Sequence, residues 1–150
     1  MRALVQRVLY ARLSINGLVF SSIGPGMLLF LGVHKEDTTL DIEYLIAKLC
    51  RLRIFDDTNG VMNFSLLDTG GEAMVVSQFT LFANCKKGNR PSWMGAAAPD
   101  VAEPLYLHFL DEMGSFLGRP VESGKFGASM QIELLNDGPV TLSLDSQNRV

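Results

Sequence analysis

Three apolar-rich runs within residues 2 to 33 constrain the fold of this chain most strongly. The first two, LVQRVLYARLSI and LVFSSI, flank the dipeptide Asn16-Gly17, and Gly24-Pro25-Gly26 separates the second run from MLLFLGV. Asn-Gly between apolar runs is a strong signal for a β-hairpin, because both residues tolerate the positive φ angles of a tight turn. The N-terminal part of the chain is therefore predicted to form consecutive strands.

Two later segments have helical periodicity. Thr38 to Arg51 begins with a capping-box pattern, in which Asp41 is the partner of Thr38. A second helix is predicted from Asp100, with Glu103 as its capping partner, and ends at Gly118. The apolar positions expected to face the core are Ile42, Leu45, Ile46, Leu49 and Leu52 in the first helix, and Val101, Leu105, Phe109, Met113 and Phe116 in the second.

The remaining apolar runs are typical of strands. AMVVSQFTLFA, residues 73 to 83, is apolar enough to be a central strand. Two more strands are expected over Ala128 to Leu135 and Val140 to Leu144, joined by a turn at Asn136 to Pro139. The pattern predicts one α+β domain over residues 1–150, with a curved or barrel-like, mostly antiparallel sheet and two main helices packed outside. Periodicity alone does not separate barrel from open sheet. The polar tail, Asp145 to Val150, is expected to be frayed.

Composition narrows the class of protein. Hydrophobic residues make up 47% of the chain and charged residues 19%, which is typical of a folded globular domain. The longest apolar stretch, Met27 to Val33, is too short to span a membrane, and the N-terminus lacks the apolar core of a signal peptide, so a cytoplasmic protein is expected. A net charge of −3 argues against a broad basic face that coats nucleic acid, but not against contact with the end of an RNA. We expect neither DNA nor a membrane as a partner.

Metal chemistry has little support. Cys50 and Cys85 are far apart in sequence and belong to no CxxC or Cys/His cluster, so both are predicted to be unpaired thiols. His34 and His108 are the two histidines, and neither has a second ligand type at metal-binding spacing. We expect no metal ion and no organic cofactor.

Polar residues at the end of the run 73 to 83 are candidates for chemistry. Ser77 and Thr80 are the hydroxyls, but acyl transfer through either would need an adjacent base, and the chain has no GxSxG elbow. Structural hydroxyls at a strand end are the more common case. A basic loop follows directly, and it is suited to hold a few phosphates or is simply solvated. Its charged residues are Lys86, Lys87 and Arg90.

Two short segments, SQFTL at Ser77 to Leu81 and NDGPVT at Asn136 to Thr141, together resemble the signature motifs of the D-aminoacyl-tRNA deacylases. These editing enzymes cleave the ester between a D-amino acid and its tRNA. The resemblance continues through QRV (6 to 8), GNRPS (88 to 92) and GKFGASM (124 to 130). Departures are slight: Trp93 stands where phenylalanine is common, and Ser123 stands where threonine often precedes the glycine.

The resemblance implies a homodimer that hydrolyses D-aminoacyl-tRNA and mischarged glycyl-tRNA at the aminoacylated 3′ adenosine and spares L-aminoacyl-tRNA. Ser77, Gln78, Phe79 and Thr80 would line the pocket, with main-chain N–H groups near Phe79 and Thr80 facing the ester carbonyl. The vicinal hydroxyl of the tRNA ribose would assist, so that the enzyme mainly orients the ester and stabilises the oxyanion.

Five further residues acquire roles from the resemblance. Gly138-Pro139, by itself an ordinary turn, would be cis, would enter the partner subunit's site, and would exclude an L side chain there. Arg7, which on pattern alone is equally an outward-facing strand residue, would hold the Gly-Pro loop. Phe126 and Met130, core residues by default, would wall the adenosine and aminoacyl pocket.

Two alternatives from other classes stay open. One is a non-catalytic module that binds an RNA end or a small ligand on the same β scaffold. The other is a Ser/Thr esterase that uses Thr80 as a covalent nucleophile.

Overall fold

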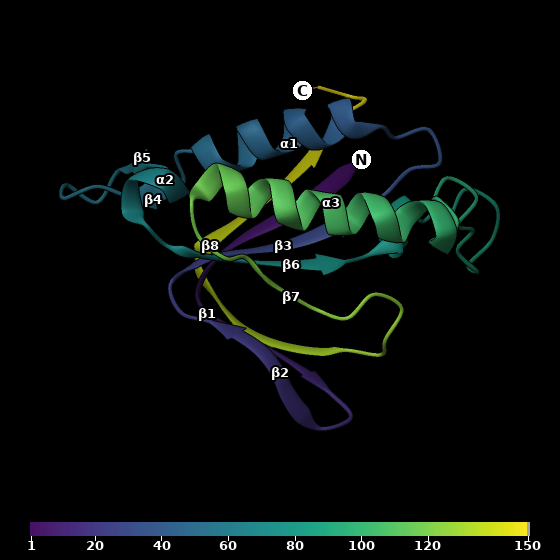
Figure 1. Ribbon diagram of the computed structural model, residues 1–150, viewed down its shortest axis with the longest axis horizontal. Coiled ribbons are helices and arrows are strands. Elements are labelled where there is room, and N and C mark those ends of the chain that lie inside the picture. Colours follow the sequence, from purple (N-terminus) through teal and green to yellow (C-terminus); the bar gives the residue numbers. More distant parts are fainter. Residues whose placement is uncertain (150) are drawn as a thin grey trace.

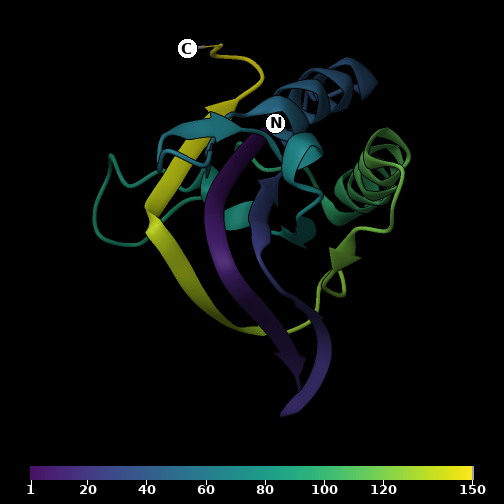
Figure 2. The same cartoon turned by 90° about the vertical axis from the view of Figure 1, so that its left-hand side faces the viewer.

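The computed structural model describes residues 1 to 149 and shows a strongly curved sheet with helices packed on one side (Figures 1 and 2). The strands are β1 (Arg2–Ile15), β2 (Leu18–Ile23), β3 (Gly26–Gly32), β4 (Phe55–Asp56), β5 (Met62–Phe64), β6 (Glu72–Ser77), β7 (Glu122–Ser123) and β8 (Gln131–Asp145). The helices are α1 (Thr39–Arg51), α2 (Leu66–Thr69), the 3-10 helix η1 (Phe79–Phe82) and α3 (Pro99–Leu117). The predicted α+β fold with a curved, barrel-like sheet is confirmed.

Strand β1 organises the sheet. Its N-terminal half pairs with β3 and its C-terminal half with β2, while β8 pairs along nearly its whole length, all antiparallel. Strand β6 is parallel to β3, and β7 is parallel to β6, so the sheet is mixed. The β1–β2 hairpin turns at Asn16 and Gly17, whose φ angles of 52° and 77° are those the Asn-Gly signal predicts.

The core has two parts because β3 and β6 are buried on both faces. Met27, Leu29 and Leu31 of β3 pack toward α1 and α3, whereas Leu28 and Met74 face the inside of the curved sheet. A strand that is covered on both faces does not alternate between polar and apolar residues, and this explains the continuous apolar runs of β3 and β6.

Helix α1 has the predicted capping box at Thr38 and buries the predicted stripe, with Leu52 partly buried. Helix α3 begins at Pro99 after Ala98, and no side chain caps it, so the capping pattern predicted for Asp100 and Glu103 is wrong. Proline is preorganised for the first helical turn and needs no such cap. The helix does end at Gly118.

The face that α3 buries also differs at both ends from the predicted stripe. Val101 and Phe116 are 44% and 37% exposed. The helix buries Ala102, Tyr106, Phe109, Met113 and Leu117. Both sets have helical spacing, and packing against the sheet selects the face that carries Tyr106.

Two strand predictions need correction. The apolar run 73 to 83 is strand only as far as Ser77, and its second half forms η1, whose Phe82 is buried. The strands predicted on either side of Asn136 to Pro139 are one strand, β8. Asn136 pairs with Val8 and Thr141 with Gln6, so residues 137 to 140 bulge out opposite Arg7.

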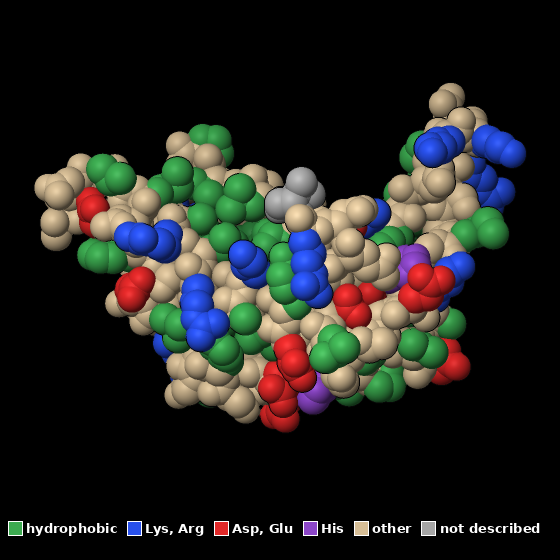
Figure 3. Space-filling view, turned by 90° about the horizontal axis from the view of Figure 1, so that it is seen from above, with side chains coloured by type: hydrophobic (Ala, Val, Ile, Leu, Met, Phe, Trp, Pro, Cys, Tyr) green, Lys and Arg blue, Asp and Glu red, His purple; other side chains and the backbone are tan. Residues whose placement is uncertain are grey.

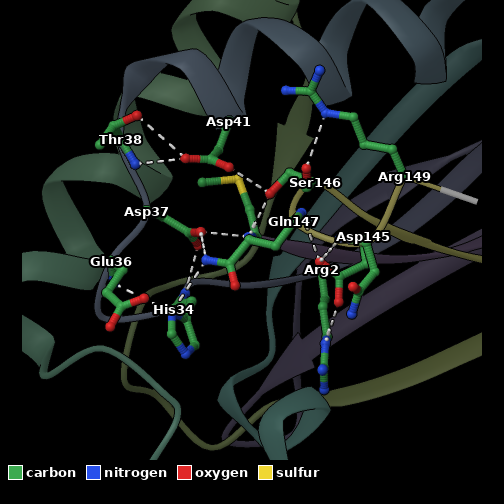
Figure 4. Close-up of polar contacts among 12 residues, drawn as sticks. Arg2, His34, Glu36, Asp37, Thr38, Asp41, Asp145, Ser146, Gln147 and Arg149 are labelled. Atoms are coloured by element: carbon green, nitrogen blue, oxygen red, sulfur yellow. Dashed lines mark hydrogen bonds and ion pairs between the residues drawn. The ribbon is translucent and has the colours of Figure 1, made fainter.

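The two ends of the chain are held together beside α1 (Figure 4). The Met1 amino group, which is buried, donates to Asp37 Oδ1 at 2.5 Å and to Ser146 Oγ at 2.7 Å. Ser146 Oγ in turn donates to Asp41 at 2.6 Å, and Arg2 pairs with Asp145. The first residues of the tail expected to be frayed are thus tied into the fold, and Val150 lies outside the described residues.

As predicted, both cysteines are unpaired thiols; Cys50 is buried and Cys85 is exposed. Burial raises the pKa of the Cys50 thiol to about 11, so it stays protonated at neutral pH. Within residues 1 to 149 no helix is long and apolar enough to cross a membrane.

Candidate active site

A cavity of about 380 Å³ opens where the ends of β3 and β6 meet η1 and the start of α3. Its walls are mainly apolar, with the polar groups of Ser77 and Gln78 at one side. The lining residues are Leu31, Val33, Ser77, Gln78, Phe79, Trp93, Ala96, Ala97, Pro99, Ala102, Tyr106, Phe126 and Gly127. An apolar pocket with a few convergent polar groups is the usual form of a small-molecule site.

The floor of the cavity is the point at which the strand becomes a helix. Ser77 ends β6 opposite Leu31, and the Gln78 N–H donates to the Leu31 carbonyl at 2.8 Å. Phe79 and Thr80 then begin η1. The first N–H groups of a helix have no acceptor within it, so the main-chain N–H groups of these two residues remain available to a ligand.

Of the four floor residues expected from the sequence, Ser77, Gln78 and Phe79 line the cavity, and Thr80 does not. The Thr80 hydroxyl accepts a hydrogen bond from the Gln78 side-chain amide. Neither histidine is hydrogen-bonded to Ser77 or Thr80 in the described part of the chain; the His34 ring packs on Phe82, with centroids 5.3 Å apart. Among residues 1 to 149, no histidine, carboxylate or lysine side chain is hydrogen-bonded to either hydroxyl, so neither is paired with a base.

Tyr106 forms the inner wall of the cavity and was not predicted from the sequence. Its hydroxyl donates to the Val75 carbonyl at 2.8 Å, and its ring lies 5.9 Å from that of Phe126. Burial raises the pKa of Tyr106 to about 12, so the phenol stays protonated at neutral pH and keeps its hydrogen bond to the Val75 carbonyl. One signal in the sequence could have identified it: Tyr106 stands three residues before Phe109, a spacing that places both side chains on the same face of the helix.

Phe126 and Met130 lie on two sides of the floor. Phe126 lines the cavity, whereas Met130 lines a neighbouring depression of about 250 Å³ that also contacts Ser77, Gln78 and Phe79. The structure thus brings both residues of the GKFGASM segment to the predicted floor.

Arg7 holds the loop that contains Gly138 and Pro139. It is only 6% exposed, and its Nε donates to the Asp137 carbonyl at 3.1 Å. Its Nη1 donates to the Ile54 carbonyl at 2.6 Å and to Asp56 Oδ1 at 3.0 Å. The charge is thus compensated by two carboxylates, because Asp137 Oδ2 also lies 3.1 Å from Nε.

The Gly138-Pro139 peptide is cis, and Gly138 has a φ of 127°. A Cβ added at Gly138 would lie 2.8 Å from Val140 Cγ2 and 3.1 Å from Arg7 Nη2, so the bulge requires glycine there. Neither Gly138 nor Pro139 is among the described residues that line the cavity of their own chain.

The predicted basic residues Lys86, Lys87 and Arg90 are exposed in the loop between η1 and α3. This loop forms the projection at the right of Figure 3, where Lys and Arg side chains gather. None of the three lines the cavity, but Trp93, which follows them in the same loop, does. No group of three or more His, Cys, Asp and Glu side chains among residues 1 to 149 is placed to hold a metal.

Comparison with known proteins gives a consistent result over the full chain. The family model described as D-Tyr-tRNA(Tyr) deacylase matches residues 4–145. D-aminoacyl-tRNA deacylases of Parabacteroides distasonis and Bacteroides thetaiotaomicron are 56% and 51% identical to this chain, over 99% of each sequence. The chain therefore belongs to the D-Tyr-tRNA(Tyr) deacylase family.

Solved structures agree on the fold. A protein named c-Myc DNA unwinding element binding protein superposes with a TM-score of 0.92 at 40% identity, over 97% of this chain and 98% of that one. A probable eukaryotic D-amino acid tRNA deacylase superposes with a TM-score of 0.83 at 18% identity, over 95% and 97% of the two chains.

Proposed function

We propose that this protein hydrolyses the ester bond of D-aminoacyl-tRNA and of mischarged glycyl-tRNA, releasing the free amino acid and tRNA. The observation that carries the proposal is the cavity floor: the SQFT segment ends β6 and presents two helix-start N–H groups beside an apolar cavity. The family membership supports the same activity. Because aminoacyl-tRNA is the substrate, we expect the protein to act in the cytoplasm.

In the proposed mechanism, the main-chain N–H groups of Phe79 and Thr80 receive the ester carbonyl oxygen and stabilise the negative charge that develops on it. Water attacks the carbonyl carbon with the assistance of the vicinal ribose hydroxyl, the bond to the ribose oxygen breaks, and that oxygen leaves with a proton. No side-chain nucleophile is required, which fits a Thr80 hydroxyl engaged by Gln78.

Discrimination by handedness is assigned to Gly138-Pro139 of the partner subunit. The bulge in β8 projects from the sheet, is anchored by Arg7, and does not line its own cavity. In a dimer it would enter the other subunit's cavity and receive the α-ammonium of the substrate, leaving no room for an L side chain. D side chains would point elsewhere, so a range of them is accepted.

An exposed apolar surface supports the proposed dimer. Large apolar side chains stand in solvent on the β1–β2 hairpin and on β8, and clusters of this kind mark interaction sites. They are Leu9, Tyr10, Leu18, Val19, Phe20, Leu135 and Leu142.

Incubation with D-tyrosyl-tRNA and, separately, L-tyrosyl-tRNA tests the proposal. Release of D-tyrosine with L-tyrosyl-tRNA intact is the expected result. Binding without release of either amino acid would identify a non-catalytic RNA-end module. Hydrolysis of both esters would identify an ordinary esterase.

A further inference from the structure

The cavity has room for the end of the substrate and little more. Its volume of about 380 Å³ lies near the lower end of the range for small-molecule sites, roughly 300 to 1,000 Å³. The proposed function places the terminal aminoacyl-adenosine there. The preceding nucleotide must then lie on the protein surface beside the cavity mouth.

Two exposed aromatic rings stand at this mouth. Phe79 and Trp93 both line the cavity, yet they are 56% and 38% exposed. Their ring centroids are 5.3 Å apart at an interplanar angle of 76°, a favourable edge-to-face arrangement. Each ring supports the other, and a large apolar surface is left in contact with water.

The main chain around Trp93 is fixed to the fold. The Asn84 and Ser92 N–H groups and carbonyls bond reciprocally at 2.9 and 3.0 Å, which closes the loop just before Trp93. After it, the Ala96 N–H donates to the Trp93 carbonyl at 2.9 Å, and the Ala97 N–H donates to Val33 of the segment after β3 at 2.9 Å. The main chain that carries the ring is therefore already ordered before a ligand binds, which lowers the entropy cost of binding.

The charge of the same loop suits a nucleic acid strand. Lys86, Lys87 and Arg90 are exposed within the few residues before Trp93, in a protein whose net charge is −3. Aromatic rings beside a basic groove are the usual means of binding single-stranded nucleic acid, because every base has a face on which to stack.

We propose that Phe79 and Trp93 form a stacking platform for the base of the nucleotide that precedes the terminal adenosine, with the basic loop holding the adjoining phosphates. The proposal rests on the function proposed above and adds a second nucleotide site outside the cavity. Trp93 is the binding residue here and takes no part in the chemistry.

Trp93 is the one tryptophan of the chain, so its fluorescence reports on the platform directly. The probes are non-hydrolysable 3′-amide analogues of D-tyrosyl-adenosine: the nucleoside alone, the dinucleotide with a preceding cytidine, and the same dinucleotide with an abasic ribose in place of the cytidine. The cytidine dinucleotide is expected to quench Trp93 and to bind about tenfold more tightly than the abasic one.

Variants test whether the preference for the cytidine dinucleotide comes from Trp93. Trp93→Ala should bind the cytidine and abasic dinucleotides equally, so that the ratio of the two affinities falls to one; because Trp93 also lines the cavity, this ratio, and not the affinity for the nucleoside analogue, is the readout. Trp93→Phe should retain most of the preference, because a phenyl ring still stacks. Met94→Ala is the matched control, since Met94 is exposed in the same loop and does not line the cavity; it should behave as wild type.

Equal affinity of the wild-type protein for the cytidine and abasic dinucleotides would overturn the platform, and this test needs no variant to fold. A Trp93→Ala protein that keeps the preference would overturn it as well. Hydrolysis of D-tyrosyl-tRNA by the same preparation separates the two proposals: with hydrolysis but no base preference, the platform alone fails, whereas without hydrolysis the proposed function fails.

Discussion

The Gln78 side-chain amide donates a hydrogen bond to the Thr80 hydroxyl across the first turn of η1. The contact pairs the hydroxyl with an amide rather than with a base. It favours a structural role for Thr80, in agreement with the proposal that main-chain N–H groups stabilise the oxyanion.

Thr80→Ala is therefore expected to lower kcat/KM for D-tyrosyl-tRNA by no more than about tenfold, the worth of one hydrogen bond. Loss of a covalent nucleophile would cost about a millionfold. Single-turnover rates distinguish the two magnitudes.

The complementary substrate carries a 2′-deoxy terminal adenosine with the ester on the 3′ oxygen. The proposed mechanism gives the vicinal hydroxyl a part in the attack, so this substrate should react more slowly with the intact enzyme than normal substrate reacts with Thr80→Ala. The reverse order would restore Thr80 as the nucleophile.

Replacing Lys86, Lys87 and Arg90 together by alanine should raise KM for D-tyrosyl-tRNA about tenfold and leave kcat nearly unchanged, because phosphate contacts position the substrate without doing chemistry. In a plot of log(kcat/KM) against log(salt concentration), the slope should become less negative by about 0.7 for each phosphate contact that is lost. Lys48→Ala, an exposed lysine of α1, is the control. A collapse of kcat at unchanged KM and salt slope would contradict this role.

The dimer prediction concerns the exposed hairpin. Leu18 is 75% exposed at the tip of β2, and Leu18→Asp should weaken self-association because the carboxylate would be buried without a partner at the interface. Sedimentation should show wild-type dimers and a shift toward monomer in the variant, with deacylation falling in parallel. Leu40→Asp, on exposed α1 surface, should change neither. A monomeric protein with full activity would refute the cross-subunit site.

Acid stability depends on the network that joins the chain ends. Burial acts to raise the pKa of Asp41, but hydrogen bonds from Ser146 and Thr38 outweigh it and lower the pKa overall. A lowered pKa in the folded state stabilises the protein above the ordinary value, about 3.9, and this contribution is lost as pH falls through the lowered value.

Ser146→Ala removes one of these hydrogen bonds, so its unfolding free energy should fall less steeply than that of wild type as pH drops below about 4. Denaturant titrations at several pH values measure the slope. Ser143→Ala, an exposed serine of β8, should retain the wild-type slope. An unchanged slope for Ser146→Ala would show that the Asp41 contact does not matter.

The sequence predicted those turns and helix caps whose geometry depends only on neighbouring residues. Asn16-Gly17 specifies its own turn, and Thr38 with Asp41 specifies its own cap, so both appear as expected. The start of η1 was not predicted because the apolar run continues through it. Phe82 is apolar because it packs in the core, and no residue in the run marks where strand pairing ends.

Tertiary packing decides the rest of the site. Tyr106 enters the wall because α3 turns that face toward the sheet, and Arg7 is buried because Asp137, Asp56 and the Ile54 carbonyl surround it. None of these partners is near Arg7 in sequence. The bulge of Asp137 to Val140 also appears only when β8 is placed against β1.

The most direct test of the account is the ratio of kcat/KM for D-tyrosyl-tRNA to that for L-tyrosyl-tRNA, measured with the wild-type protein on the same tRNA. If a Gly138-Pro139 wedge excludes the L side chain from a site that otherwise only orients the ester, the D ester should be hydrolysed at least about a thousandfold more efficiently, a difference of roughly 4 kcal/mol in transition-state binding. A ratio near one, with both esters hydrolysed, would contradict the account.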